Sequence, residues 1–215
     1  MEATDAALIE NRREIKTRNK AWAQRFAAFL AGRKISPNQI SVISMFFAAL
    51  ALSAFVWARQ AQQPALLLLA VLGIQLRLLC NLFDGMVAVE FNKKSAVGEI
   101  YNEVPDRISD TLIILGAGLY CQNHEFAIHL AWANIFLATM TAYIRVFGAA
   151  LGKGHRFLGP MAKQHRMFLI SAAALAEWVM PGEALYIGLW IMFVLLIATV
   201  VRRLIVLSRS LQEVP

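Results

Sequence analysis

The uncharged apolar run at residues 40–57 (ISVISMFFAALALSAFVW) constrains this chain more than any other feature. A helix rises about 1.5 Å per residue and the hydrocarbon layer of a bilayer is roughly 30 Å thick, so a run of this length is long enough to cross it. The segment Ser36-Pro37-Asn38-Gln39 predicts where the helix begins. It supplies a serine cap, a proline at the first helical position and a glutamine that completes a capping box.

Other stretches also predict membrane-spanning helices, and no stretch predicts a strand. The composition agrees, because 59% hydrophobic and 16% charged residues with a mean hydropathy of +0.55 do not describe a soluble domain, in which about a quarter of residues are charged. The predicted fold class is therefore all-α, a polytopic membrane protein with six transmembrane helices. After the run at 40–57, the predicted spans are Pro64–Val89, Gly98–Cys121, Phe126–Leu151, Ala162–Met180 and Ala184–Leu207.

Basic residues gather on one side of the predicted spans. The chain has 21 Lys+Arg and 14 Asp+Glu, a net charge of +7, and this excess on so apolar a chain favours an anionic membrane surface over nucleic acid. By the positive-inside rule, both termini lie on the cytoplasmic side of the cell's inner membrane. One side carries Arg59 alone, and the other carries the basic N-terminal segment with Lys93, Lys94, Lys153, Arg156, Lys163, Arg166, Arg202, Arg203 and Arg209.

Residues 1–35 predict a tail and an amphipathic helix ahead of the membrane domain at residues 36–215. This pattern is typical of an interfacial helix on the cytoplasmic leaflet, in contact with membrane lipids. A soluble helical extension that packs against another protein is the alternative. The apolar face would hold Ile15, Trp22, Phe26, Phe29 and Leu30, and the basic remainder Arg12, Arg13, Lys16, Lys20 and Arg25.

Acidic residues concentrate where the second and third predicted helices meet. Carboxylates inside a membrane are costly unless they are paired, metal-bound or wetted, so their clustering predicts a functional cavity. Asp84 and Asp106 lie at similar distances from the connecting loop, which predicts that they face each other across one pocket. The acidic residues of this stretch are Asp84, Glu90, Glu99, Glu103, Asp106 and Asp110.

The same stretch carries a gapped motif. Starting at Asn81, NLFDGMVAV is followed by eight residues and then by GEIYNEVPD. It resembles the signature of the CDP-alcohol phosphotransferase family, D-x-x-D-G-x-x-A-R, eight residues, G-x-x-x-D-x-x-x-D. Ser36-Pro37-Asn38 is similar to the family's threonine-proline-asparagine entry to the first span, and the resemblance covers about residues 10–207. The matching positions are Asp84, Gly85, Ala88, Gly98 and Asp106.

The resemblance implies a homodimeric transferase of phospholipid synthesis that moves a phosphatidyl group from CDP-diacylglycerol to a small alcohol and releases CMP. It implies Mg²⁺ or Mn²⁺ as the cofactor, held by Asn81, Asp84, Asn102 and Asp106, with Asp106 also the catalytic base. Gly85, Ala88 and Gly98 would lie against the CDP group. A pyrophosphate leaving group needs a hard cation with oxygen ligands, and a base must reach the attacking hydroxyl, so these residue types suit the chemistry.

Three signature positions differ, because Asn81 and Asn102 replace aspartates and Val89 replaces the arginine. Asparagine offers an oxygen but no charge, so one metal, or a rearranged ligand set, is an alternative to two. Arg77 either supplies the missing positive charge or neutralises Asp84 or Asp110 as a structural pair. Glu103 and Arg107 have the spacing of an ion pair within a helix.

Basic residues near the fourth and fifth helices indicate a phosphorylated acceptor of the glycerol 3-phosphate or inositol phosphate type. Arg145, Lys163 and Arg166 would form the clamp, or would serve only topology and contact with anionic lipid headgroups. Two alternatives to the enzyme stay open. One is a catalytically impaired relative that binds nucleotide or headgroup without turnover, and the other is a transporter or proton pathway.

Overall fold

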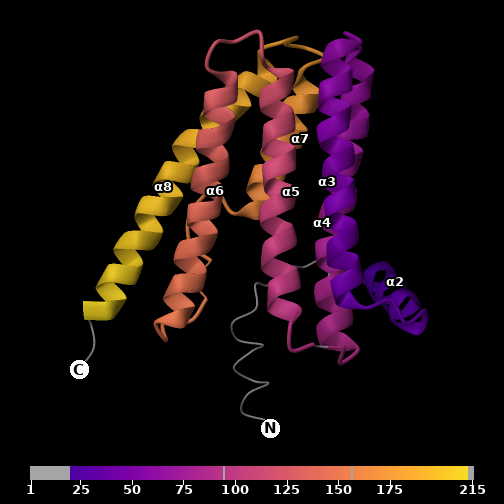
Figure 1. The fold of residues 1–215 in the computed structure, drawn as a ribbon, viewed down its shortest axis with the longest axis vertical. Coiled ribbons are helices and arrows are strands. Elements are labelled where there is room, and N and C mark those ends of the chain that lie inside the picture. The colour runs from indigo at the N-terminus through magenta and orange to yellow at the C-terminus, as the bar shows by residue number, and fades with distance from the viewer. Residues whose placement is uncertain (1–19, 94, 156, 213–215) are drawn as a thin grey trace.

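The computed structural model describes residues 20–93, 95–155 and 157–212, and this part of the chain is helical without strands (Figure 1). The predicted all-α class is therefore confirmed for these residues. Residues 1–19 lie outside them, and with them Ile15, Arg12, Arg13 and Lys16 of the predicted amphipathic helix, as do Lys94 and Arg156. The elements are α2 (Ala21–Gly32), α3 (Pro37–Gln60), the 3-10 turn η2 (Pro64–Leu66), α4 (Leu67–Glu90), α5 (Gly98–Tyr120), α6 (Ala127–Ala150), α7 (Lys163–Ala176) and α8 (Ala184–Gln212).

Four segments of the described chain are long and apolar enough to cross a membrane: α3, η2 with α4, α6 and α8. Helix α5 has 23 residues but carries the polar signature in its first half. Helix α7 has 14 residues, fewer than the roughly 20 that span a bilayer. The predicted span at 162–180 is shorter because the helix stops at Glu177, whose carboxylate instead accepts from the backbone N–H groups of Gly182 (2.5 Å) and Leu185 (2.7 Å) before and in α8.

Helix α3 begins where the sequence predicts. The Ser36 hydroxyl accepts from the Gln39 backbone N–H at 3.2 Å, and the Gln39 side-chain oxygen accepts from the Ser36 N–H at 2.9 Å. Pro37 follows the cap, where its missing N–H costs no hydrogen bond. The capping box fixes the first turn of α3 close to the acidic stretch.

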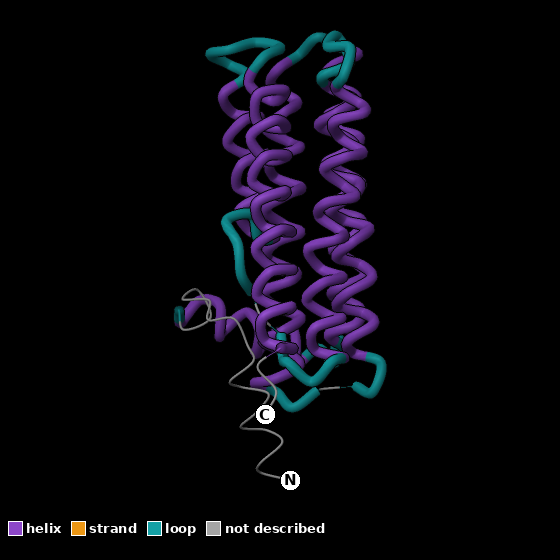
Figure 2. Tube along the Cα trace, turned by 90° about the vertical axis from the view of Figure 1, so that its left-hand side faces the viewer, coloured by secondary structure: helices purple, strands orange, loops and turns teal. Residues whose placement is uncertain are grey.

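The long helices run side by side, and α3 packs along both α4 and α5 (Figures 1 and 2). Glycine allows these close contacts. A Cβ at Gly73 would lie 2.8 Å from the Phe47 carbonyl oxygen, and one at Gly116 would lie 2.9 Å from the Leu52 Cα. Small-residue packing also explains Gly118 of α5, because a Cβ there would collide with Ala131.

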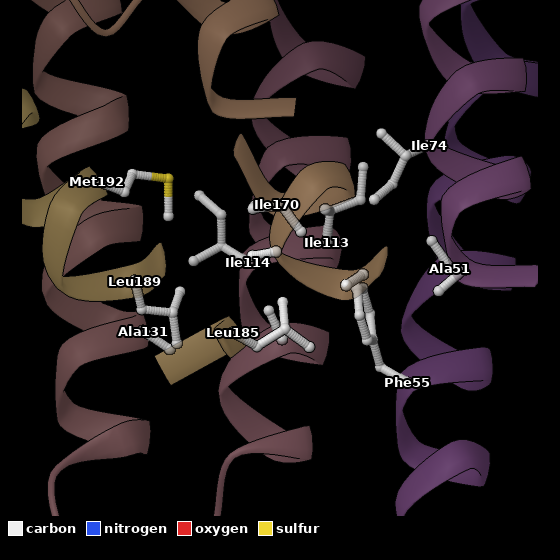
Figure 3. Packing of buried hydrophobic residues seen from close by; sticks show 14 of the residues in the cluster. Ala51, Phe55, Ile74, Ile113, Ile114, Ala131, Ile170, Leu185, Leu189 and Met192 are labelled. Atoms are coloured by element: carbon white, nitrogen blue, oxygen red, sulfur yellow. The ribbon is translucent and has the colours of Figure 1, made fainter. Parts of the chain in front are cut away.

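The apolar core joins α3, α4 and α5 to α6, α7 and α8 (Figure 3). Ile113 and Ile114 of α5 are fully buried at its centre, with Phe55 of α3 on one side and Leu189 of α8 on the other. The core holds α5 rigidly between the two halves of the bundle. The polar first half of α5 is thereby presented at one end.

Helix α2 lies across the bundle, near the end that carries the α4–α5 loop (Figures 1 and 2). Ala23 and Ala27 are buried, and the Phe26 ring packs on Phe83 of α4 at 4.6 Å between centroids. Trp22 and Phe29 remain about half exposed. A helix in the second half of the predicted amphipathic segment is therefore confirmed, and its contact with lipid stays a prediction.

Candidate active site

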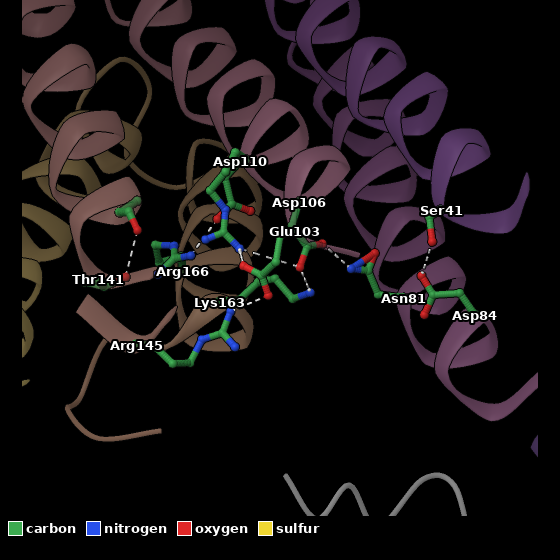
Figure 4. Close-up of polar contacts among 12 residues, drawn as sticks. Ser41, Asn81, Asp84, Glu103, Asp106, Asp110, Thr141, Arg145, Lys163 and Arg166 are labelled. Carbon is green, nitrogen blue, oxygen red and sulfur yellow. Dashed lines mark hydrogen bonds and ion pairs between the residues drawn. The ribbon is translucent and has the colours of Figure 1, made fainter. Parts of the chain in front are cut away.

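Polar side chains from α4, α5 and α7 meet at one depth of the bundle (Figure 4). On α4, Arg77 and Asn81 are four residues apart and therefore share a face. Both reach Asp106 of α5: Asn81 Nδ2 donates to Asp106 Oδ1, and Arg77 Nη2 lies 3.3 Å from the same oxygen. The signature segments of the two helices therefore lie side by side, but the signature residue of α4 that contacts Asp106 is Asn81, one turn from the predicted Asp84.

Arg77 is fully buried and lies between two carboxylates. Its Nη2 is 2.8 Å from Asp110 Oδ1 and 3.3 Å from Asp106 Oδ1. The interpretation of Arg77 as a structural partner of Asp110 is confirmed, and Asp106 is a second partner. A buried guanidinium between carboxylates avoids the cost of an unpaired charge in an apolar bundle.

The start of α7 supplies two more cations. Lys163 Nζ lies 2.6 Å from Asp106 Oδ2, and Arg166 Nη2 lies 2.5 Å from Asp110 Oδ2. Because α7 occupies only part of the bundle's length, its first turn lies beside the acids of α5 (Figure 1). Lys163 and Arg166 at the start of this helix are therefore paired with the acids of α5.

A second ion-pair cluster lies one turn before Asp106 on α5. Glu103 accepts from Arg107 at 3.0 Å, which confirms the predicted pair within the helix, and from Arg145 of α6 at 2.5 Å. The Arg145 guanidinium also lies 3.4 Å from a ring nitrogen of His155 and over the Phe157 ring. Arg145 thus borders the acidic site without touching Asp106.

Arg145 also lines a small cleft between α6, α8 and the segment before α7, with room for about one water molecule. Lys153 and Arg203 contribute further positive charge to its wall, and Ile144 and Leu158 contribute apolar surface. The Arg203 guanidinium donates to the Leu158 carbonyl at 2.8 Å, which holds the segment before α7 against α8.

Asp84 lies one turn beyond Asn81 on α4, with a different partner. The Ser41 hydroxyl of α3 donates to Asp84 Oδ2 at 2.8 Å. Asn81 therefore stands between the two carboxylates, bonded to Asp106 and one turn from Asp84 (Figure 4). Asn102 is exposed on α5, and it shares a face with Asp106.

Comparison with known proteins identifies the family of this chain. The profile of the CDP-alcohol phosphatidyltransferase family matches residues 34–207, which is most of the chain. The chain belongs to the CDP-alcohol phosphatidyltransferase family. The predicted class of function, an enzyme of phospholipid synthesis that uses a CDP-activated alcohol, is therefore confirmed at the level of the family.

Two curated relatives of this CDP-alcohol phosphatidyltransferase are 26% identical to it. Inner membrane protein YnbA of Escherichia coli aligns over 68% of this chain and 70% of its own length. Archaetidylinositol phosphate synthase of Pyrococcus horikoshii aligns over 84% and 92%. The name of the E. coli relative, an inner membrane protein, and the four apolar helices of this chain agree with placement in a membrane.

Solved structures of Mycobacterium tuberculosis phosphatidylinositol phosphate synthase share the fold. The form with manganese and citrate superposes with a TM-score of 0.74 at 20% identity, and it covers 86% of this chain and 88% of that one. The form with CDP-diacylglycerol bound gives 0.71 at 18%, over 86% and 92%. At 18–20% identity, the likeness to these structures shows a shared fold and no more.

The oxygen donors of this family member fit one divalent cation better than two. Asp84 brings a carboxylate, and Asn81 Oδ1 is buried and has no hydrogen-bond partner among the described residues. Amide and carboxylate oxygens are ligands that Mg²⁺ and Mn²⁺ accept. Asp106, by contrast, already binds Arg77, Asn81 and Lys163, and within the described ranges no three His, Cys, Asp or Glu side chains gather as a metal site.

The predicted CDP-binding positions of this family member lie on α4 and at the start of α5. A Cβ at Gly98 would have only the Ser95 hydroxyl nearby, at 3.5 Å, so helix packing does not explain this glycine. Gly85 and Ala88 are half-buried on α4, one and four residues after Asp84. These three residues stay predicted nucleotide contacts.

Ser41 is the residue of the site that the sequence did not indicate. It follows the capping segment of α3 by one turn, and its hydroxyl reaches an acid 43 positions later. The spacing from Pro37 places it on the side of α3 that packs on α4, and that periodicity was the available signal.

Proposed function

We propose that this CDP-alcohol phosphatidyltransferase transfers a phosphatidyl group from CDP-diacylglycerol to a small phosphorylated alcohol, of the glycerol 3-phosphate or inositol phosphate type, and releases CMP. The observation that carries the proposal is the contact of Lys163 with Asp106, because it places a cation for an anionic acceptor beside a base. The similar proteins support it. One relative is named archaetidylinositol phosphate synthase, and the phosphatidylinositol phosphate synthase of Mycobacterium tuberculosis was solved with CDP-diacylglycerol bound.

Asp106 acts as the base through Oδ2. Its other oxygen, Oδ1, accepts from both Asn81 and Arg77, which uses its two lone pairs. Oδ2 accepts from Lys163 and keeps a second lone pair, because Arg107 Nη2 at 4.0 Å is beyond hydrogen-bond reach. The acceptor hydroxyl gives its proton to Oδ2 as its oxygen attacks the phosphatidyl phosphorus, and the bond from that phosphorus to the CMP oxygen breaks.

Lys163 and Arg145 hold the acceptor's phosphate. The Lys163 side chain is 22% exposed and its ammonium has N–H groups to spare after it binds Asp106. Arg145 lines the small cleft between α6 and α8, and its side chain is 13% exposed. Arg166, the third residue of the predicted clamp, is buried on Asp110 and the Met161 carbonyl, so it positions the first turn of α7 for Lys163.

One divalent cation, Mg²⁺ or Mn²⁺, would be held by Asp84 with the amide oxygens of Asn81 and Asn102, where it would neutralise the charge that develops on the pyrophosphate. Ser41 fixes the rotamer of Asp84 through the bond to Oδ2. Gly85, Ala88 and Gly98 leave room for the cytidine nucleotide. The diacylglycerol chains would extend into the surrounding lipid.

The site opens to the cytoplasm in this proposal, with α5 and α7 completing six membrane segments. The α4–α5 loop, the end of α6 and the end of α8 share one end of the bundle with α2 (Figure 1). Lys93, Lys153 and Arg209 are at that end, and positive charge marks the cytoplasmic side. The chain is a homodimer of the inner membrane with α2 on the cytoplasmic leaflet.

The test is release of CMP from CDP-diacylglycerol by the purified full chain, with glycerol 3-phosphate, inositol phosphate and their unphosphorylated forms as acceptors. Asp106→Asn is expected to abolish release, because the amide cannot take the proton. Glu99→Gln, a change of equal size on the exposed first turn of α5, is the matched control and keeps activity. A fully active Asp106→Asn variant would remove Asp106 as the base.

A catalytically impaired relative that binds nucleotide or headgroup without turnover is the second candidate. The observation in its favour is the loss of two carboxylates at positions 81 and 102. It predicts that CDP-diacylglycerol binds to the purified chain while no acceptor in the panel elicits CMP.

A further inference from the structure

The bond between Asn81 and Asp106 closes the space between α4 and α5. Asn81 Nδ2 is the atom that faces Asp106, because a carboxylate oxygen accepts hydrogen bonds and an amide oxygen would be repelled by it. A carboxylate at position 81 would place two acids in contact, and only a proton or a cation between them would make that arrangement stable. The amide removes this requirement.

The positive charge on this side of the site comes from the chain itself. Lys163 Nζ is 2.6 Å from Asp106 Oδ2, and Arg77 Nη2 is 3.3 Å from Oδ1 and 2.8 Å from Asp110. Arg166 takes the remaining oxygen of Asp110. These three cations face the two charges of Asp106 and Asp110 before any metal binds, so a metal ion at Asp106 would be repelled by a guanidinium and an ammonium.

The surroundings of Asp84 differ from those of Asp106. Ser41, a neutral donor, is its side-chain partner, and the Asn81 oxygen that points away from Asp106 is buried without a donor. The same asparagine therefore binds Asp106 with its nitrogen and keeps an oxygen that no donor among the described residues occupies.

We propose that Lys163 and Arg77 are resident cations that take the place of a metal ion on the Asp106 side, so that this chain binds one divalent cation, on the Asp84 side. The proposal rests on the proposed function for the role of that cation, and it concerns the number of ions and the residues that exclude a second. Asn81 is the positioning residue, because its amide joins Asp106 to α4 without a metal bridge.

The experiment counts Mn²⁺ on the purified full-length chain in detergent, by electron paramagnetic resonance of free Mn²⁺ during titration, with and without CDP. Wild type is expected to bind one ion per chain. Asn81→Asp combined with Lys163→Met is expected to bind two, because the pair restores a facing acid and removes the ammonium. Lys153→Met, which removes a lysine from the cleft by α6, is the control and keeps the count at one.

Two Mn²⁺ ions on wild type, or none, would overturn the proposal whatever the variants do, so it does not depend on the double variant folding. A folded double variant that still binds one ion, with folding judged by its thermal transition, would also overturn it. CMP release is measured on the same wild-type samples. Absence of turnover with a count of one contradicts the proposed function and leaves the inference standing, so the two failures are distinguishable.

Discussion

Arg77→Met is expected to destabilise the protein substantially. Arg77 is fully buried and its Nη2 binds both Asp106 and Asp110. Removing one partner of a buried ion pair costs about 3–5 kcal/mol. The lower end applies here, because Asp106 keeps Lys163 and Asp110 keeps Arg166. At about 2–4 °C per kcal/mol for a chain of this size, a loss of about 3 kcal/mol lowers the unfolding temperature by roughly 6–12 °C.

The measurement is the thermal transition of the purified protein in one detergent at one concentration. Arg202→Met, which removes an exposed arginine of α8, is the control and is expected to change stability by less than about 0.5 kcal/mol. Arg77 and Asp110 bind each other, so each single variant loses the same contact. The double variant Arg77→Met with Asp110→Asn should therefore be more stable than the sum of the singles by about 0.5–3 kcal/mol. A transition of Arg77→Met equal to that of Arg202→Met, with strictly additive doubles, would refute the role of Arg77 as a buried partner.

Three further outcomes are expected. Ser36→Ala removes the hydroxyl of the α3 capping box and should cost about 1 kcal/mol in the same thermal assay; an unchanged transition would show that the cap does not stabilise α3. Gly116→Val should destabilise strongly, since even a Cβ there lies 2.9 Å from α3, whereas Gly32→Ala has nothing within 4 Å and should be neutral or slightly stabilising; equal effects would contradict the close packing of α3 and α5. Ser41→Ala leaves the buried Asp84 without its side-chain donor and should weaken Mn²⁺ binding by about tenfold or more, with a loss of about 1–3 kcal/mol in stability; unchanged affinity would show that Ser41 does not position Asp84.

The elements of this protein follow from local rules, and the sequence therefore predicted them well. Apolar runs of spanning length became α3, α4, α6 and α8, and the start of α3 was predicted to the residue because cap and box are local hydrogen bonds. The predicted span at 162–180 was too long, since its end depends on Glu177 binding the start of α8, a contact between segments. Hydropathy contains no information on such contacts.

The candidate site, like the fold, was predicted only in part from the sequence. The spacing of the signature determined which residues of α4 and α5 share a face, and it brought Asn81 to Asp106. The partners of the acids, however, lie on other helices: Ser41 on α3, and Lys163 and Arg166 on α7. The sequence places these two cations at the start of the fifth predicted helix, as an acceptor clamp or a topology signal, and only their contacts with Asp106 and Asp110 identify them as counterions.

The sequence by itself determined that the chain is a helical membrane protein of the CDP-alcohol phosphatidyltransferase family, because hydrophobic period and motif spacing are properties of a single segment. The tertiary structure alone decided how the site's charge is balanced. Electrostatic energy falls with the distance between groups and rises with their burial, and neither quantity exists until α3, α5 and α7 pack around α4.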